Sequence, residues 1–224
     1  ASINEFEQKL CQLTGIDYAI ATNNGTSSLH IALLANGIKD NDEVLVPAMT
    51  FVASANAISY CNAIPHFVDS DVEHLGIDSQ KLLEYLNKNT IVKNNQCFNI
   101  KTGRRIFAIM PVHVYGFIGD IEKLKEIADE FKIFVIEDAA ESLGSFKNRK
   151  HAGTFGHCGC ISFNGNKIIT TGGGGALITN NEKVANIARH LSTTAKMKHP
   201  FDYFHDTIGY NYRMPALNAA LGIS

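Results

Sequence analysis

Short apolar segments alternate with helical segments along almost the whole chain, and this alternation constrains the fold more than any other feature of the sequence. Apolar runs typical of strands cover residues 18–21, 43–46, 64–68, 107–110, 133–136, 160–163 and 176–179. Helical patterns cover residues 2–10, 27–35, 52–60, 79–86, 121–131, 182–191 and 215–224. Such alternation predicts crossover connections and a mainly parallel sheet, and strands that are apolar throughout predict helices on both faces. We therefore expect an α/β fold.

One polar stretch, residues 87–105, interrupts this rhythm. Within it, Lys101-Thr102-Gly103 has the composition of a tight turn, so we expect a surface hairpin that leads into the strand at 107. Ligands of mainly parallel sheets bind beyond the carboxyl ends of the strands. The polar residues at those ends are therefore the candidate site residues.

The composition argues against several kinds of partner. The chain has 224 residues and a formal net charge of −2, so no basic surface for nucleic acid is expected. No apolar run approaches the roughly 20 residues that a membrane helix needs. The five cysteines are odd in number and scattered, which indicates reduced thiols and a cytoplasmic location. Cys158 and Cys160 stand two apart, but no second pair completes a zinc site, so no metal is expected.

The stretch Asn24-Gly-Thr-Ser-Ser28 lies between a predicted strand and a predicted helix. Gly25 permits a tight turn there, and Thr26 and Ser27 offer hydroxyl and backbone N–H groups at the helix N-terminus, which is a favourable phosphate site. A simple helix cap is the alternative interpretation. The dinucleotide fingerprint Gly-x-Gly-x-x-Gly is absent.

Two charged residues follow predicted strands. Asp138 ends a buried strand, where a carboxylate is costly unless a cation meets it, although a helix-capping role is the alternative. Lys167 lies between a strand and the four glycines at 172–175. A lone lysine is usually a solvated surface residue, but one held beside a sheet end is a usable amine nucleophile.

Together, these features match the needs of pyridoxal 5'-phosphate (PLP). This cofactor needs an anion site, a carboxylate that keeps the pyridine nitrogen protonated, and a lysine that forms the Schiff base. We therefore predict that Lys167 and Asp138 are the catalytic residues. The glycines would let the backbone lie close to cofactor and substrate.

The chain resembles the large domain of the DegT/StrS family of PLP-dependent nucleotide-sugar aminotransferases. The similarity is carried by NGTSSL from residue 24, PAMTFVA from 47, EDAA from 137, SFNGNK from 162 and GYNYRM from 209. It implies a fold-type I PLP-dependent transferase, active as a homodimer with shared sites. Residues 1–224 are then expected to form the PLP-binding large domain, without the N-terminal segment and the C-terminal small domain.

The resemblance also implies roles for individual residues. Thr26, Ser27 and Ser162 match phosphate ligands, and Phe51 matches an aromatic ring that stacks on the pyridine. For Phe51 alone, a place in the core is the alternative. Asp138 matches the partner of the ring nitrogen. The cofactor contacts implied in this way are Gly25, Thr26, Ser27, Phe51, Asp138, Glu141, Ser162, Asn164, Lys167 and Asn211.

Four positions need separate comment. Asn211 matches an asparagine that reaches the cofactor phosphate of the neighbouring subunit. Glu141 stands where Gln or His is more usual, which leaves its contact with the ring hydroxyl open. His113 and Arg213 are expected to contact substrate. A structural role for His113 is an alternative, and Arg213 could hold a phosphate or a carboxylate.

The resemblance implies transfer of an amino group from L-glutamate to a nucleotide-linked keto sugar. It is strongest to the branch that aminates C4 of UDP-linked 4-keto-6-deoxy-N-acetylhexosamines for surface glycans such as bacillosamine and legionaminic acid. A PLP-dependent sugar dehydratase is an alternative, although such enzymes typically carry histidine where this chain has Lys167. A noncatalytic PLP-binding domain is another.

Overall fold

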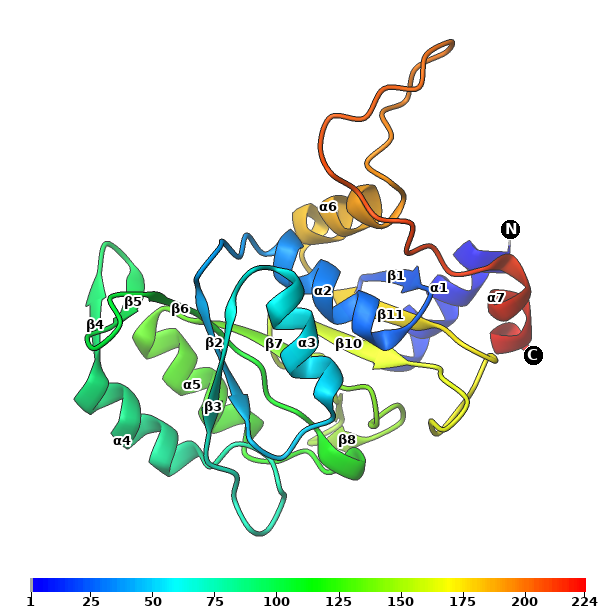
Figure 1. The fold of residues 1–224 in the computed structure, drawn as a ribbon. Helices are drawn as coiled ribbons and strands as arrows, with labels where there is room; N and C mark the ends of the chain where they lie inside the picture. Colours follow the sequence, from blue (N-terminus) through cyan, green and yellow to red (C-terminus); the bar gives the residue numbers. More distant parts are fainter. Residues whose placement is uncertain (1) are drawn as a thin grey trace.

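The computed structural model describes residues 2–224, and its centre is one twisted, mainly parallel sheet (Figure 1). Every neighbouring pair along the main path of the sheet is parallel except the two that involve β11. The expected α/β sheet is therefore confirmed, with one antiparallel strand. In spatial order the strands are β1 (Tyr18–Thr22), β11 (Gly175–Thr179), β10 (Cys158–Ser162), β7 (Phe134–Asp138), β6 (Arg105–Ile109), β2 (Glu43–Pro47) and β3 (Ile64–Val68).

The predicted hairpin is also confirmed. Its turn at Lys101–Gly103 joins β5 (Gln96–Asn99) to β6, and these two strands pair antiparallel. A further strand that was not predicted, β4 (Thr90–Lys93), pairs antiparallel with β5 through a turn at Asn94–Asn95, where both residues have positive φ, a conformation that asparagine tolerates. A second small hairpin, which was not predicted, joins β8 (Phe146–Lys147) and β9 (Lys150–His151).

Helices cover both faces of the sheet, as expected. One face packs against α2, α3 and α6, and the other against α4 and α5 at one end and α1 and α7 at the other. The helices are α1 (Ser2–Thr14), α2 (Gly25–Ala35), α3 (Val52–Tyr60), α4 (Ser79–Asn89), α5 (Ile121–Phe131), α6 (Glu182–Ser192) and α7 (Ala216–Ile223).

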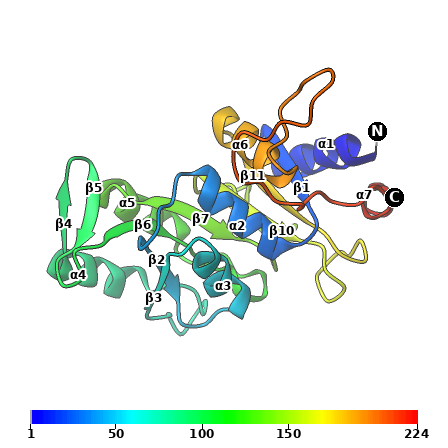
Figure 2. The same cartoon turned by 45° about the horizontal axis from the view of Figure 1, so that its top comes forward.

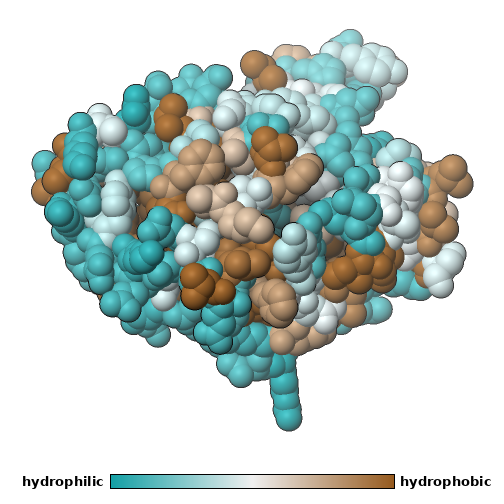
Figure 3. All heavy atoms as spheres, turned by 60° about the horizontal axis from the view of Figure 1, so that its bottom comes forward, coloured by the Kyte–Doolittle hydropathy of each residue, from teal (hydrophilic) through white to brown (hydrophobic). Residues whose placement is uncertain are grey.

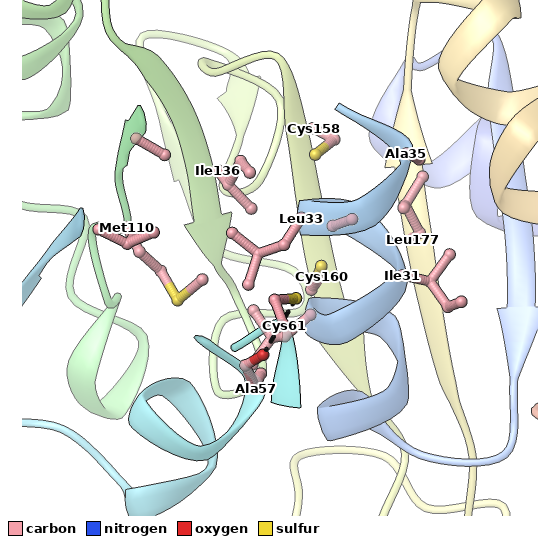
Figure 4. Close-up of a cluster of buried hydrophobic side chains, with 14 of the residues drawn as sticks. Ile31, Leu33, Ala35, Ala57, Cys61, Met110, Ile136, Cys158, Cys160 and Leu177 are labelled. Atoms are coloured by element: carbon pink, nitrogen blue, oxygen red, sulfur yellow. Dashed lines mark hydrogen bonds between the residues drawn. The ribbon is translucent and has the colours of Figure 1, made fainter. Parts of the chain in front are cut away.

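The cysteines belong to the packing of this core. Figure 4 shows Cys158 and Cys160 of β10 beside Leu33 of α2 and Ile136 of β7. Burial raises the pKa of the Cys158 thiol to about 12, so this thiol stays protonated and behaves as a small apolar group. The described part of the chain contains no helix long and apolar enough to cross a membrane.

A long loop between α6 and α7 leaves the body of the molecule in both ribbon views (Figures 1 and 2). Residues 196–206 form no strand of the sheet, and Phe201 and Tyr203 there are almost fully exposed. The loop then returns to the body at Tyr210 and Tyr212, whose stacked rings pack over His30 of α2. This anchoring fixes the path of residues 209–213.

Candidate active site

A cavity of about 330 Å³ lies where the carboxyl ends of several strands meet the N-terminus of α2. Asp138 ends β7, Ser162 ends β10, and Thr50 follows β2. These three residues line the cavity together with Lys167. The structure thus brings the two predicted catalytic residues into one pocket, at the edge of the sheet that the strand directions predict.

Asp138 is a buried carboxylate with few partners. The hydroxyl of Ser54 donates to its Oδ2 at 2.6 Å, and the N–H of Ala140 donates to its Oδ1 at 3.2 Å. Burial raises the pKa of Asp138, although these hydrogen bonds and the charges of His113 and Lys167 act in the opposite direction. A cationic N–H group in the cavity would stabilise the charged form of this carboxylate.

Lys167 is held at the cavity wall rather than in solvent. Its side chain is 13% exposed, and its Nζ lies 2.9 Å from Oε1 of Glu141 and 6.0 Å from the centre of the Phe51 ring. Phe51 itself is 71% exposed and lines the cavity, so the alternative that it belongs to the core is wrong. An exposed ring beside a cavity can stack on a planar ligand.

The N-terminus of α2 closes one end of the cavity. Gly25 and Thr26 line it, and the first N–H groups of a helix have no intrahelical partners, so they can bind an anion. Asn24 caps the helix by accepting from the N–H of Ser27 at 2.8 Å. Ser27 is therefore buried behind the turn and is not part of the cavity lining, whereas Ser162 and Asn164 are.

The expected role of the glycine run needs correction. None of the glycines at 172–175 lines the cavity. A Cβ atom on Gly175 would lie 2.5 Å from the backbone of Asn24, and one on Gly25 would lie 2.9 Å from Cβ of Ser162. These glycines allow β11, β10 and the α2 turn to pack closely, which shapes the phosphate end of the cavity from behind.

His113 does not reach the cavity. It is 2% exposed, and its Nε2 lies 2.7 Å from Oε2 of Glu137. The expected substrate contact is therefore not made by this side chain in the structure, and the structural alternative describes it better. Its Nε2 is already bonded inside the core, on the other side of β7 from Asp138.

Asn211 and Arg213 also lie outside the cavity. Both are exposed, and they alternate with Tyr210 and Tyr212, which face the core. Arg213 lines a separate hollow with Lys196 and Lys198. The contacts expected for Asn211 and Arg213 are thus not made to the cavity of their own chain.

Two residues that contact the predicted site residues were not predicted from the sequence. Ser54, buried behind the cavity wall, donates to Asp138 and follows Phe51 by three residues, and that helical spacing is the signal that could have found it. Tyr115 lies in a short 3₁₀ turn (Val114–Gly116) with a φ of 52°, and its backbone N–H donates to Glu141 at 3.1 Å. Nothing in the sequence around Tyr115 indicated this contact.

These residues fit pyridoxal phosphate. The buried Asp138 lacks a direct cationic partner within the described part of the chain, the face of Phe51 is exposed to the cavity, and an anion site and an amine stand at the two remaining sides. Each of these features is left incomplete by the protein alone, and each corresponds to one part of the cofactor.

Comparison with known proteins places the fold among the fold-type I PLP-dependent aminotransferases. The profile of the DegT/DnrJ/EryC1/StrS aminotransferase family matches residues 1–224, and the chain belongs to that family. One relative, the GDP-perosamine synthase of Caulobacter vibrioides, is 41% identical over 222 residues, which cover 99% of this chain and 55% of the relative. The chain thus spans about half the length of the curated relatives it matches.

Solved structures give the same assignment. A DegT DnrJ EryC1 StrS aminotransferase from Brucella abortus superimposes with a TM-score of 0.87 at 32% identity, over 98% of this chain and 56% of that one. NtdA from Bacillus subtilis, solved with bound cofactor PMP, has a TM-score of 0.84 at 30% identity, over 100% of this chain and 47% of that one.

Proposed function

We propose that this chain is the PLP-binding part of a sugar aminotransferase that moves an amino group from L-glutamate to the C4 ketone of a UDP-linked 4-keto-6-deoxy-N-acetylhexosamine. The observation that carries the proposal is the meeting of Lys167, Asp138 and the exposed Phe51 ring at one cavity beside the α2 N-terminus. Family membership supports the same class of reaction.

Each residue has a definite task in this proposal. When bound, PLP supplies an electron sink that stabilises negative charge at the carbon next to the amino group. Asp138 holds a proton on the ring nitrogen, and Ser54 and Ala140 keep its carboxylate in place. Lys167 would hold the cofactor through its Nζ and would move a proton to or from the carbon that bears the amino group. Thr26 and Ser162 hold the phosphate, and Phe51 holds the ring plane.

The nucleotide of the substrate has a second candidate. The UDP-linked hexosamine rests on the resemblance of the segments around Asp138 and Lys167. A relative 41% identical is a GDP-perosamine synthase, which favours a GDP-linked sugar instead. Both candidates require the same amine transfer, so they differ only in what the remainder of the substrate site binds.

An assay of the full-length protein separates them. Glutamate and PLP are incubated with a panel of UDP-linked and GDP-linked 4-keto sugars, and the amino sugar and 2-oxoglutarate are quantified. We expect both products with the UDP-linked N-acetylhexosamine and none with Lys167→Ala. Turnover confined to GDP-linked sugars would select the second candidate. A Lys167→Ala protein that turns over normally would overturn the proposed reaction.

We also propose that two copies of the chain share their active sites. Support comes from Asn211 and Arg213, which are exposed and do not line the cavity of their own chain, and from the exposed aromatic loop before them. Hydrophobic side chains also gather in several patches on the face shown in Figure 3. Exposed apolar patches of this kind are typical of interfaces.

Subunit mixing tests this arrangement. Lys167→Ala and Asn211→Ala homodimers are first confirmed inactive and are then allowed to exchange subunits. If Asn211 acts in the partner's site, each mixed dimer has one intact site, so activity should recover to about a quarter of wild type for random mixing. Demonstrated exchange without recovery would place Asn211 in its own subunit's site.

A further inference from the structure

The ion pair between Lys167 and Glu141 is a prominent feature of the cavity that the proposed function leaves unused. Oε1 of Glu141 lies 2.9 Å from Nζ of Lys167, and Oε2 accepts from the N–H of Tyr115 at 3.1 Å. The carboxylate is thus fixed at both oxygens, one by the lysine and one by the backbone of the 114–116 turn. Its position is set by the fold and not by the lysine alone.

Other charged groups near Lys167 are engaged elsewhere. The Asp138 carboxylate, at the end of β7, accepts from Ser54 and Ala140, and His113 behind it is paired with Glu137. From α3, Phe51 presents a neutral ring. From the 114–116 turn, Tyr115 presents its backbone N–H to Glu141. Within residues 2–224, Glu141 is therefore the carboxylate in direct contact with the lysine nitrogen.

Glu141 is ionised in this setting. Its burial alone would raise its pKa, but the hydrogen bonds from Lys167 and Tyr115, with the charge of Lys167, outweigh burial and lower the pKa of Glu141. The side chain is only 35% exposed, so water screens the pair less than it screens a surface ion pair.

We propose that Glu141 is the counter-ion of the Lys167 nitrogen both before and after that nitrogen forms an imine with an aldehyde cofactor. The ammonium gives up one proton, and the free amine adds to the aldehyde carbon, forming the C–N bond. The aldehyde oxygen then leaves as water, whose two protons are the one released by the ammonium and one further proton from the same nitrogen. The resulting iminium nitrogen keeps one proton and one positive charge, so the carboxylate faces a cation throughout.

A defined chemical consequence follows. A protonated imine carbon is more electrophilic than a neutral one, so an anion that retains the proton favours attack by the incoming amino donor. Glu141 is thus a positioning residue whose charge sets the pH at which the imine loses its proton. The inference rests on the proposed function for the identity of the aldehyde, PLP, and for its attachment to Lys167.

Absorbance titration of the PLP-loaded, full-length protein tests the inference. Protonated and neutral PLP imines absorb at different wavelengths, so the midpoint of their interconversion can be read directly without any measurement of turnover. In Glu141→Gln, which keeps the size and one acceptor oxygen but removes the charge, the midpoint should fall by about one pH unit, a tenfold change in the protonation equilibrium. Glu141→Asp keeps the charge, and its midpoint should lie between those of wild type and Glu141→Gln.

The chain offers a matched control. Glu126 on α5 also lies 2.9 Å from a lysine, Lys123, but this pair is exposed and neither residue lines the cavity. Glu126→Gln should leave the midpoint unchanged. Equal midpoints in wild type, Glu141→Gln and Glu126→Gln would overturn the counter-ion role while leaving the proposed function intact. Wild-type protein that forms no imine band and no borohydride-fixed adduct at Lys167 would overturn both.

Discussion

The two sides of the end of β7 carry neighbouring acids with opposite surroundings. On one side, Glu137 is fully buried and accepts from His113 and from the N–H groups of Gly153, Phe155 and Gly156, at 2.6–2.8 Å. On the other side, the Asp138 carboxylate faces the cavity and, within residues 2–224, accepts from Ser54 and Ala140 alone.

The difference separates a structural acid from a functional one. Donors of the fold surround the Glu137 carboxylate, so its charge is stabilised without any ligand, and it fixes residues 151–156 to the sheet. Asp138 can accept a further hydrogen bond, and burial raises its pKa. A cationic N–H group that enters the cavity would therefore stabilise the charged form of this carboxylate. Of two consecutive residues in one strand, the fold thus satisfies one and leaves the other open to a ligand, as the proposed function requires of Asp138.

The largest effect is expected at Lys167. Lys167→Ala should abolish turnover and covalent attachment of the cofactor, because no other lysine among residues 2–224 lines the cavity, while PLP can still bind through its phosphate. Borohydride reduction and peptide mass mapping provide the measurement. An adduct at Lys123 or Lys183 would show that the assigned lysine is wrong.

Asp138→Asn should come next. The amide keeps the shape of the side chain and one acceptor oxygen for the N–H of Ala140, and the Ser54 hydroxyl can rotate to accept from the amide NH₂ group. The charge proposed to hold the ring nitrogen protonated is removed. Proton abstraction should slow by several orders of magnitude, since each 1.36 kcal/mol changes the rate tenfold. Single-turnover kinetics with glutamate measure this step. Thermal stability should fall little, because a buried charge with incomplete partners contributes little to folding. A near-normal rate would argue against the role of Asp138.

Glu137→Gln should give the opposite result, a large loss of stability with a much smaller loss of rate. An amide has one acceptor oxygen and would direct its NH₂ group toward N–H donors, leaving some of them unsatisfied. We expect a loss of about 2–4 kcal/mol of unfolding free energy in urea titrations. The rate per folded molecule should stay far above that of Asp138→Asn. Glu126→Gln, on the surface, should change stability by less than about 0.5 kcal/mol. Equal rate losses in Glu137→Gln and Asp138→Asn would show that the two acids do not differ in role.

The fold was largely predictable from the sequence because its signals are local. Apolar runs and helical spacing placed the strands and helices within a few residues, and the direction of crossovers placed the site at the carboxyl edge. The hairpin that leads into β6, with its turn at Lys101–Gly103, was also predicted, whereas the additional strand β4 and its turn at Asn94–Asn95 were not. The order of strands, and β11 as the antiparallel one, depends on packing between distant segments, which periodicity does not encode.

The site was predictable in its parts but not in its contacts. Asp138 and Lys167 are signalled by charged residues next to apolar strands, and their meeting followed from topology. The ion pair of Lys167 with Glu141 depends on how two loops pack, and so does the capture of His113 by Glu137. A histidine at a strand end has the same sequence signal whether it faces a cavity or the core, and here it faces the core.

The smallest predicted effect concerns Glu43, a third buried acid. It begins β2 and so lies at the end of the strands opposite the cavity. Asn99 and His66 contact its Oε2 at 2.9 Å, and Thr102 donates to Oε1 at 2.6 Å. Burial alone would raise its pKa, but these hydrogen bonds outweigh burial and lower the pKa of Glu43 from 4.5 to about 2. Glu43 therefore resembles Glu137 and not Asp138.

The sign of its pH dependence follows from linkage. Because the unfolded chain binds this proton near pH 4.5 and the folded protein only near pH 2, the stability that Glu43 contributes is complete above pH 4.5 and is lost as the pH falls toward 2. Urea titrations at several pH values should show wild type and Glu43→Gln differing most above pH 4.5 and converging below it. Glu126→Gln should stay parallel to wild type across this range. A difference between wild type and Glu43→Gln that does not change with pH would mean that the carboxylate is not held charged by its three donors.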